Sequence, residues 1–490
     1  MSKLKTARNV ALYATGEIIP RVLSFLLLPV LTKYLSTSDY GISSYINTIA
    51  TFLYVLTTLS VNSYALRTYY KAGSESGKKK LLGNIFVFLC SWGLIMLLLE
   101  ALLFPVLLNA FSVQVPFYPY FLLGLIINFF DVTSIIPLIT YRVNEDAKGF
   151  VLLSVGRTVL QYAFILLLIV YFKMGLLGSF LGRLITCVPF FIIYVLVVKK
   201  RGIFTIDIQQ IKEALRFSLP LLPGALSYLV ISMFDRVILE RYVSMSALGI
   251  YSVAFTLSLT LNIVIQGLYR SFEQKIFREH NSHDYLQKVD ALYKIYIAAL
   301  YIPALCVILF SKEILMFFTS KQYFGAAGYV PYLVVAVIIS GMNTFMGTLL
   351  IADDKRKVIS YSSFTAAILS LIINLVFIKY FGVTGACFAS ILSFLIVSVF
   401  YFTKTAMQKK YIVQQICFLL IFLLIKYIVQ TDVSLIMEIA IKLLLLIVFA
   451  VLVKLTICLK LPPVSALKTL KRLKQYNLLM QVFILIAIFK

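Results

Sequence analysis

The segment Lys33-Tyr-Leu-Ser-Thr-Ser-Asp-Tyr-Gly41-Ile-Ser-Ser-Tyr45 returns 208 residues later as Arg241-Tyr-Val-Ser-Met-Ser-Ala-Leu-Gly249-Ile-Tyr-Ser-Val253. Six of the thirteen positions are identical, and each copy follows a long apolar run with paired prolines. At about 30–35 residues for a membrane span and its loop, this distance corresponds to about six spans. An even number of spans returns the chain to its starting side, so we expect parallel repeats related by an axis along the membrane normal. Such a duplication is typical of transporters.

The composition is that of a protein surrounded largely by lipid. Of the 490 residues, 61% are hydrophobic and 13% are charged, and the mean hydropathy is +0.97. Nearly the whole chain divides into apolar runs long enough to cross a hydrocarbon core of about 30 Å. Fourteen spans are predicted: 10–34, 42–66, 82–108, 117–140, 150–172, 175–198, 217–239, 247–269, 291–310, 330–352, 358–380, 382–403, 411–429 and 436–458.

These spans predict an all-α integral membrane fold in which the duplication gives two six-helix halves, followed by two further spans. The expected units are an N-terminal lobe over 1–200, a cytoplasmic amphipathic linker over 201–216, a C-terminal lobe over 217–405, helices 13 and 14 over 406–460, and a basic tail over 461–490. The apolar stretch Leu478–Phe489 is too short to cross a membrane, so it is expected to be interfacial.

Basic residues lie almost entirely on one side of the predicted topology. The formal net charge is +25, and with the N-terminus inside, the cytoplasmic segments carry 30 Lys and Arg against about six outside. This asymmetry is the positive-inside rule. It predicts a multi-pass membrane protein with both termini cytoplasmic. It also accounts for the charge without a nucleic-acid partner.

The sequence offers no recognisable catalytic or metal-binding motif. All six cysteines fall within predicted spans without a CxxC pair, and the two histidines share one predicted loop. Nucleotide-binding and zinc-protease motifs are missing. We therefore expect a protein that is not an enzyme and that uses neither a metal nor a cofactor.

Ionisable residues inside the spans are the candidate functional residues, because each costs about 2.5–3.5 kcal/mol to insert. Glu17 and Arg21 stand at i and i+4 on one face of the first span, with Arg21 near the membrane midplane. The pair either neutralises itself to permit insertion, or presents a cavity-lining cation that Glu17 holds in place. Asp131, near the middle of the fourth span, is a carboxylate that needs water or a partner.

Four further charges lie in the spans. Arg157 and Arg183 stand seven or eight residues from a membrane face, so each is either a cavity cation or a side chain that snorkels to the interface. Asp235 and Arg236 lie near the outer end of the seventh span, where an interfacial structural role is expected. Asp235 is nevertheless a candidate for ion coupling.

Polar residues also recur along the second span. Ser44, Thr48, Thr51, Thr58 and Asn62 follow helical spacing and are expected to share one face. Small hydroxyl residues often serve only to pack membrane helices together. The alternative is a hydrated wall that hydrogen-bonds the hydroxyl groups of a sugar.

Several segments resemble a known family. They are Gly16-Glu-Ile-Ile-Pro20-Arg21, Pro29-Val-Leu-Thr-Lys-Tyr-Leu35 and Asp39-Tyr-Gly41, then Ser218-Leu-Pro220-Leu-Leu-Pro223, Asp235-Arg236 and Leu248-Gly249-Ile-Tyr251. In order and spacing they resemble the Wzx-type polysaccharide flippases of the multidrug/oligosaccharidyl-lipid/polysaccharide superfamily. The resemblance implies two pseudo-symmetric six-helix lobes around a central cavity plus two C-terminal helices, an alternating-access cycle and a location in the bacterial inner membrane. It also implies a polyprenyl-diphosphate-linked oligosaccharide as cargo, for O-antigen, capsule or exopolysaccharide synthesis.

An arginine in a water-filled cavity can hold a diphosphate through charge-assisted, bidentate hydrogen bonds. We expect Arg21 to do so first, then Arg157 and Arg183, while the polar residues of the second span face the glycan. A proton or sodium gradient is the expected driving force, with Glu17, Asp131 or Asp235 as the coupling carboxylate. Polymerase or glycosyltransferase partners are consistent with this function.

Three other functions stay open. A multidrug or organic-cation antiporter of the same superfamily would favour carboxylates and aromatics in its cavity, whereas the buried charge here is mostly cationic. A lipid II flippase would differ only in its cargo. A membrane-embedded glycan polymerase or ligase would ordinarily need a long outward-facing loop, and the predicted outer loops are short.

Overall fold

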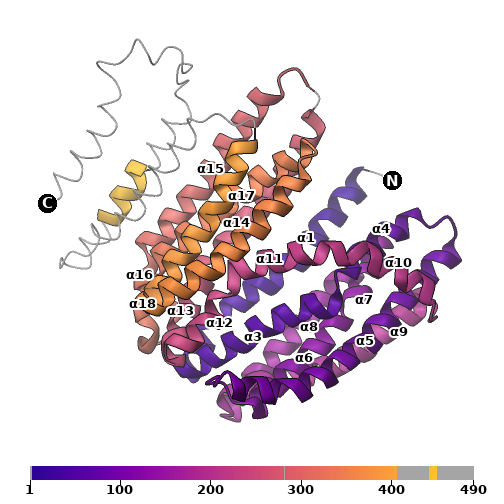
Figure 1. The fold of residues 1–490 in the computed structure, drawn as a ribbon, viewed down its shortest axis with the longest axis horizontal. Helices are drawn as coiled ribbons and strands as arrows, with labels where there is room; N and C mark the ends of the chain where they lie inside the picture. Colours follow the sequence, from indigo (N-terminus) through magenta and orange to yellow (C-terminus); the bar gives the residue numbers. More distant parts are fainter. Residues whose placement is uncertain (1–2, 281, 406–440, 450–490) are drawn as a thin grey trace.

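The computed structural model describes residues 3–280, 282–405 and 441–449, and the regular elements of these residues are all helices. The helices form two lobes that meet near α12 and α13 and diverge from there (Figure 1). The first lobe contains α1 (Lys3–Leu26), α2 (Leu28–Tyr34), α3 (Thr37–Thr58), α4 (Val61–Lys71), α5 (Glu75–Ala110), η1 (Phe117–Phe121), α6 (Leu122–Thr133), α7 (Ile135–Val143), α8 (Ala147–Leu166), η2 (Leu167–Tyr171) and α9 (Gly175–Arg201).

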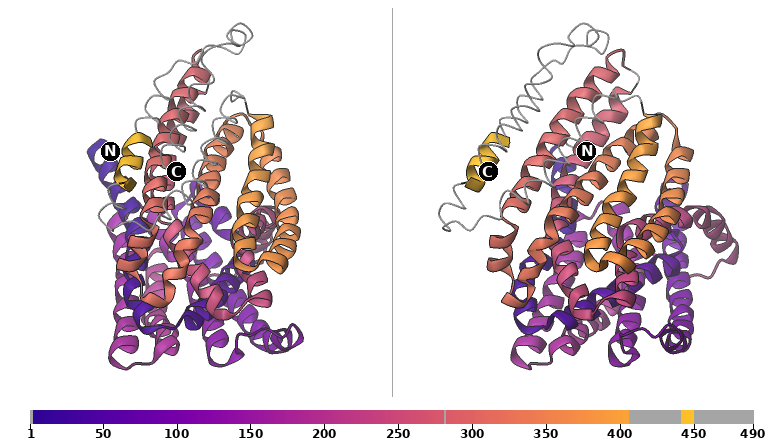
Figure 2. Two further views of the ribbon diagram at one scale, coloured as in Figure 1. Left: turned by 90° about the vertical axis from the view of Figure 1, so that its left-hand side faces the viewer. Right: turned by 60° about the vertical axis from the view of Figure 1, so that its left-hand side comes forward.

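The second lobe follows a surface helix, α10 (Ile208–Ser218). It contains η3 (Leu219–Leu221), α11 (Leu222–Met233), α12 (Asp235–Tyr242), α13 (Met245–Ser258), α14 (Leu261–Glu279), α15 (Tyr285–Leu309), α16 (Ser311–Phe318), η4 (Lys321–Gly328), α17 (Val330–Ala352) and α18 (Arg356–Lys404). The core of this lobe surrounds α17, most of whose side chains are buried. A helix over residues 441–449 lies on the side of α15 and α16 (Figure 2), where Lys442 donates a hydrogen bond to Glu313.

The first twelve predicted spans each coincide with a helix or a broken helix. Ten helices of the described residues are long and apolar enough to cross a membrane, or eleven when the bent pair α3 and α4 is one span. Helix α18 supplies two of the predicted spans, because it reverses direction at Gly382 (φ +56°). The reversal brings Lys355 Nζ within 3.0 Å of the Lys404 carbonyl oxygen. The span 411–429 and the tail 461–490 lie outside the described residues, as does most of 436–458.

The breaks in the spans have local causes. Pro29 and Pro223 stand in the first turns of α2 and α11, where a proline costs no intrahelical hydrogen bond. Between α3 and α4, Leu59 and Ser60 adopt left-handed backbone angles (φ 47° and 57°), and the chain bends by 41°. Residues beyond such a bend leave the helical face that the sequence pattern predicts.

The two lobes meet along α3 and α13, which carry the repeated segment. A Cβ atom on Gly41 would lie 2.0 Å from the carbonyl oxygen of Met245, and one on Gly249 would lie 1.8 Å from that of Thr37. Thr37 and Met245 are 208 residues apart, as are Gly41 and Gly249, so the two contacts are the same contact made in both directions. Glycine is needed at both positions because the backbones touch.

One turn further on, Ser252 Oγ donates to Ser44 Oγ at 2.7 Å, and these residues are again 208 apart. Equivalent residues of α3 and α13 are therefore in contact at two successive helical turns. This requires the two helices to be parallel and related by an axis that lies between them. This is the geometry expected of parallel repeats.

The end of the molecule beyond these glycines is closed by hydrogen bonds between the lobes. Three side chains at η4 donate to carbonyl oxygens of the α2–α3 turn: Ser320 to Thr32 at 2.6 Å, Gln322 to Leu35 at 3.0 Å and Tyr323 to Ser36 at 2.8 Å. Gln114, before η1, bonds through its backbone N–H to Glu240 Oε1 at 2.5 Å and through Nε2 to the Glu240 carbonyl oxygen at 2.6 Å. We call this end the closed end and the opposite end the open end.

The linker between the lobes is fixed to α5. Asn84 Nδ2 donates to the Asp207 carbonyl oxygen at 3.1 Å, and Asp207 N–H donates to Asn84 Oδ1 at 3.0 Å. A Cβ atom on Gly83 would lie 2.0 Å from the Ile203 carbonyl oxygen, so the two backbones touch. Helix α10 leaves Ile208 63% exposed, as the amphipathic pattern predicts for a surface helix.

Candidate functional site

A cavity of about 410 Å³ lies between the lobes on the inner side of the closed end. Residues from α1, α3, α8 and α9 of the first lobe line it, and residues from α11, α12 and α13 of the second lobe complete it. Its walls are rich in hydroxyl and amide groups: Ser24, Tyr40, Ser43, Ser44, Asn47, Thr48, Thr51, Gln161, Tyr162, Ser179, Ser252 and Thr256.

The polar residues predicted on the second span are only partly at this cavity. Ser44, Thr48 and Thr51 line it. Thr58 does not; it is buried, and its Oγ1 donates to the Val55 carbonyl oxygen at 3.2 Å. Asn62 is exposed in α4, because the left-handed residues before it turn it away from the face of α3. The predicted face therefore extends through Thr58, seven residues after Thr51 in the same helix, and the prediction is wrong for Asn62.

Arg183 presents a guanidinium group to the cavity from α9. Its Nη1 donates to Asn47 Oδ1 at 2.7 Å, and its Nη2 lies 3.9 Å from Asp131 Oδ2. Asn47 was not predicted as a site residue, although it stands three residues after Ser44 and four before Thr51 on the same helical face. The two acceptors fix the orientation of the guanidinium group and leave other N–H donors free for a ligand.

Asp131 and Arg157 form an ion pair behind Arg183. Arg157 Nη2 donates to Asp131 Oδ1 and lies 3.4 Å from Cys187 Sγ. Asp131 is thus not a lone carboxylate, and Arg157 is not among the residues that line the cavity. Because Arg157 already neutralises Asp131, the positive charge of Arg183 remains available to the cavity.

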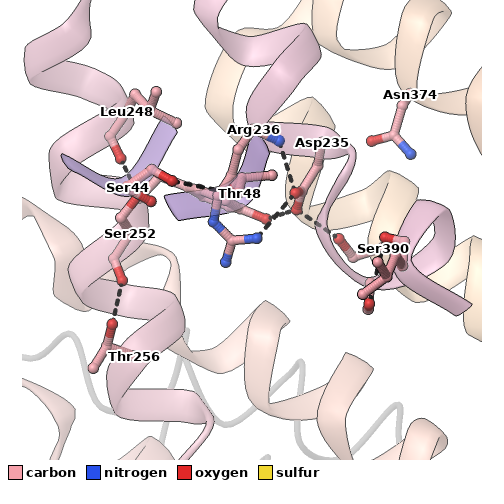
Figure 3. Close-up of polar contacts among 12 residues, drawn as sticks. Ser44, Thr48, Asp235, Arg236, Leu248, Ser252, Thr256, Asn374 and Ser390 are labelled. Carbon is pink, nitrogen blue, oxygen red and sulfur yellow. Dashed lines mark hydrogen bonds and ion pairs between the residues drawn. The ribbon is translucent and has the colours of Figure 1, made fainter. Parts of the chain in front are cut away.

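The second lobe contributes Arg236, which the sequence placed at the membrane interface. The structure corrects this: Asp235 and Arg236 are only 3% and 5% exposed, and Arg236 lines the cavity (Figure 3). The guanidinium carbon of Arg236 lies 4.0 Å from the centre of the Phe255 ring, and its Nη1 lies 3.4 Å from Asp235 Oδ1. Span 7 is divided at Phe234 into α11 and α12, and both charges stand in the first turn of α12.

Asp235 is held by two hydroxyl groups. Tyr251 donates a hydrogen bond to Asp235 Oδ2, and Ser390 Oγ lies 3.5 Å from the same oxygen. Both contacts are within the second lobe, and Figure 3 shows Asp235 between Arg236 and Ser390. A carboxylate next to a cavity cation is suitably placed for ion coupling, because its protonation would alter the charge that the cavity presents.

The predicted pairing of Glu17 with Arg21 is wrong. Glu17 Oε1 instead accepts a hydrogen bond from Arg142 Nη2 at 2.8 Å, at the end of α7. Arg21 is exposed and forms no ion pair with any described residue. It lies about 20 Å along the helix from Tyr34, in the half of the first span nearer the open end. Ser24, one turn on and on the same face, lines the cavity.

These contacts define a cavity lined by polar groups, with an arginine from each lobe. Arg183 and Arg236 provide charge-assisted donors, and the walls provide hydroxyl and amide groups that both donate and accept. Such a cavity suits an anionic ligand that carries many hydroxyl groups. Within the described residues, no group of three or more His, Cys, Asp or Glu side chains could hold a metal ion.

Comparison with known proteins gives a consistent picture. The model of the family described as "Polysaccharide biosynthesis protein" matches residues 6–271, more than half of the chain. "Lsg locus putative protein 1" of Haemophilus influenzae is 22% identical over 430 residues, which cover 83% of this chain and 100% of the relative. An "Uncharacterized membrane protein" of the same organism is 22% identical over 395 residues, covering 77% and 94%.

Two solved structures share the fold. The lipid II flippase MurJ in an inward closed conformation superposes with a TM-score of 0.73 at 15% identity, covering 91% of this chain and 98% of that one. An inward-facing multidrug resistance MATE family transporter superposes with a TM-score of 0.64 at 12% identity, covering 80% and 100%. The chain thus shares the fold of a flippase and of a multidrug transporter.

Proposed function

Because the chain belongs to the polysaccharide biosynthesis protein family, we propose that it is a flippase for a polyprenyl-diphosphate-linked oligosaccharide. It would move this cargo from the cytoplasmic to the outer leaflet of the bacterial inner membrane, for O-antigen, capsule or exopolysaccharide synthesis. The observation that carries the proposal is the pairing of Arg183 and Arg236, from different lobes, across one hydroxyl-lined cavity.

The cargo presents two polar parts that must leave water together. A diphosphate bears negative charge that only strong, preorganised donors can replace in a membrane interior, and guanidinium groups provide them. The sugars bear neutral hydroxyl groups, which the serine, threonine and asparagine side chains of α3 can satisfy. The polyprenyl chain remains in the lipid, where it needs no protein partner.

The closed end is assigned to the outer side of the membrane, because the predicted cytoplasmic loops with their many basic residues lie at the open end. The cavity then faces the cytoplasm in this conformation, ready to receive cargo. Separation of η4 from the α2–α3 turn would open the other side. Arg21, nearer the open end than Ser24, would meet the diphosphate as it enters.

A proton or sodium gradient is the proposed driving force. Glu17 is committed to Arg142, and Asp131 to Arg157. Asp235 is therefore the strongest coupling candidate, since it adjoins the cavity cation Arg236. An organic-cation antiporter is disfavoured, because two cavity arginines would repel its substrate. Polymerase or glycosyltransferase partners would supply and consume the cargo.

The proposal is tested by export of surface glycan in a strain that lacks this protein. Arg183→Ala and Arg236→Ala should each weaken cargo binding by about 10- to 100-fold, because each removes charge-assisted hydrogen bonds. Lipid-linked glycan should then accumulate in the cytoplasmic leaflet. Arg183→Lys should retain part of the activity, because it keeps the charge but loses the planar group.

Arg67→Ala is the matched control, because Arg67 is exposed on α4 and lies outside the cavity. Export is normalised to the amount of membrane-inserted protein. Arg21→Ala is expected to reduce export as well. Normal export by the Arg183→Ala, Arg236→Ala double variant would refute the assigned cargo site.

A further inference from the structure

A second cavity, of about 210 Å³, lies inside the second lobe between α11, α14, α17 and α18. Its polar lining includes Ser340, Asn343 and Thr344 on α17, together with Tyr228 of α11 and Tyr401 of α18. Not one lysine, arginine, aspartate or glutamate is among its lining residues. The cavity is thus uncharged, in contrast to the larger cavity between the lobes, and it combines hydroxyl and amide groups with apolar side chains.

Several of these polar groups retain hydrogen-bonding capacity. Asn343 is fixed in place, since its Nδ2 donates to the Phe394 carbonyl oxygen at 2.9 Å and its Oδ1 accepts from Ser398 Oγ at 2.6 Å. Thr344 Oγ1 donates to the Ser340 carbonyl oxygen at 3.0 Å, which leaves its lone pairs free to accept. Tyr228, 59% exposed, leaves its hydroxyl group available at the rim.

The chemistry of the lining restricts the class of ligand. An ion would find no opposite charge here, and its desolvation would go uncompensated. An acyl or polyprenyl chain would leave the free acceptor positions of the lining hydroxyl groups without partners, a smaller penalty because Asn343 and the Thr344 hydroxyl already donate to carbonyl oxygens. A neutral ligand with many hydroxyl groups avoids both penalties, and the tyrosine rings offer apolar faces to its C–H groups.

Helix α11 is a wall common to both cavities. Met233 lines the cavity between the lobes, whereas Tyr228 and Ile231 line the one inside the second lobe. Residues 228 and 233 are about 7.5 Å apart along the helix axis. A ligand whose phosphate lies at Arg236 therefore has an uncharged compartment with several hydroxyl groups close by, toward the open end.

We propose that the cavity between α11, α14, α17 and α18 binds one uncharged sugar ring of the cargo. This assignment rests on the proposed flippase function and adds a glycan subsite to it. A cavity of about 150 Å³ holds a benzene ring, so 210 Å³ suits a single ring and not a whole oligosaccharide. The subsite would make binding depend on the sugar as well as on the diphosphate.

The test compares two lipid probes bound to the purified full-length protein. One is undecaprenyl diphosphate, which has no sugar, and the other is the lipid-linked glycan extracted from a strain that lacks this protein. Thr344→Val removes a lining hydroxyl group at constant shape, and Ser340→Leu fills the cavity. Thr403→Val makes the same change as Thr344→Val at an exposed position of α18 outside the cavity and is the matched control.

Thr344→Val should weaken binding of the glycan probe by about 2- to 10-fold, which corresponds to one lost hydrogen bond. Ser340→Leu should weaken it at least as much. Both variants should bind undecaprenyl diphosphate like the parent protein, which also shows that they are folded. Arg183→Ala should weaken both probes.

The sugar subsite is refuted if the two cavity variants change neither probe, or change both equally. A parent protein that binds neither probe contradicts the flippase function itself, and the subsite with it. The two failures are therefore distinguishable.

Discussion

The backbone nitrogen of Gly249 lies 3.1 Å from the position that a Cβ atom on Gly41 would occupy, and the nitrogen of Gly41 lies 3.1 Å from the equivalent position on Gly249. No side chain fits at either residue while the lobes keep this arrangement. The conformation described here is thus secured by backbone contact at the centre of the internal repeat.

Gly249→Ala should shift the protein away from this conformation. The added methyl group would lie 1.8 Å from the Thr37 carbonyl oxygen, a clash that only separation of the lobes relieves. A strain of about 1.4 kcal/mol already changes a population ratio tenfold. The population is measured by disulfide yield between Thr37→Cys and Ser246→Cys, whose parent hydroxyl oxygens are 2.5 Å apart. Gly156→Ala, at a glycine with open space around it, should leave the yield unchanged.

Arg157→Ala should destabilise the protein more than Arg183→Ala does. Arg157 donates directly to Asp131, whereas Arg183 Nη2 lies 3.9 Å from Asp131 Oδ2. Loss of Arg157 therefore leaves the Asp131 carboxylate with only this distant cation. The cost could reach about 3 kcal/mol for such a partly buried pair. Thermal unfolding of the purified variants measures it. Adding Asp131→Asn to Arg157→Ala should restore part of the lost stability; a further loss would contradict this role.

Asn84→Ala should release the linker from α5. It removes the reciprocal hydrogen bonds with Asp207 that hold the segment before α10. Trypsin should then cleave after Arg201 several times faster than in the parent protein. Asn109→Ala, at an exposed position near the other end of α5, is the control and should not change the rate. Equal cleavage rates for both variants would show that Asn84 does not hold the linker.

Acid should weaken the contact between Asp146 and Arg201 at the open end. Burial alone would raise the pKa of Asp146, but hydrogen bonds from Gly149 N–H, at 2.9 Å, and from Arg201 hold this pKa below its ordinary value of 3.8. The unfolded chain therefore binds this proton more readily than the folded protein. The stabilisation is complete above about pH 4 and is lost as the pH falls through the lowered pKa.

The measurement is the melting temperature between pH 6 and pH 3. Asp146→Asn should keep the helix cap, lose the ion pair, and melt at a lower temperature near neutral pH. Its melting temperature should fall less on acidification than that of the parent. Parallel pH curves for the two proteins would show that Asp146 does not contribute to the acid sensitivity.

Thiol labelling should confirm the orientation. A single cysteine at Ser112, exposed at the closed end, should react with an impermeant maleimide added outside the cell. One at Ser76, exposed at the other end of α5, should react only after the membrane is made permeable. Outside labelling at Ser76 would overturn the orientation.

Much of the fold could be predicted because membrane spans are local features of composition. Twelve spans coincide with helices, and the repeat that contains Gly41 and Gly249 marks the axis between the lobes. Site residues were harder because their partners are distant. Glu17 pairs with Arg142, 125 residues away, and not with its helical neighbour Arg21. Local spacing cannot distinguish these two partners.

The other differences have separate causes. Arg236 was placed at an interface because it lies near the end of the predicted span, whereas its burial depends on contacts with other helices, such as that with Phe255. Asn62 left the predicted polar face at the bend after Leu59. Asn47 could have been found from its spacing alone, since it shares a face with Ser44.

The hydrogen bonds between η4 and the α2–α3 turn use side chains from one lobe and backbone groups from the other. On one side the partners are side chains, those of Ser320, Gln322 and Tyr323, and on the other they are backbone carbonyl oxygens. A substitution can delete a hydroxyl or amide group but not a carbonyl oxygen. Saturation mutagenesis should therefore find that the hydrogen bonds of this seal depend on the side chains at η4. Leu35 and Ser36 are constrained for other reasons, because Leu35 is buried in the core and Ser36 caps α3. The seal thus couples the side chains of one lobe to the backbone of the other.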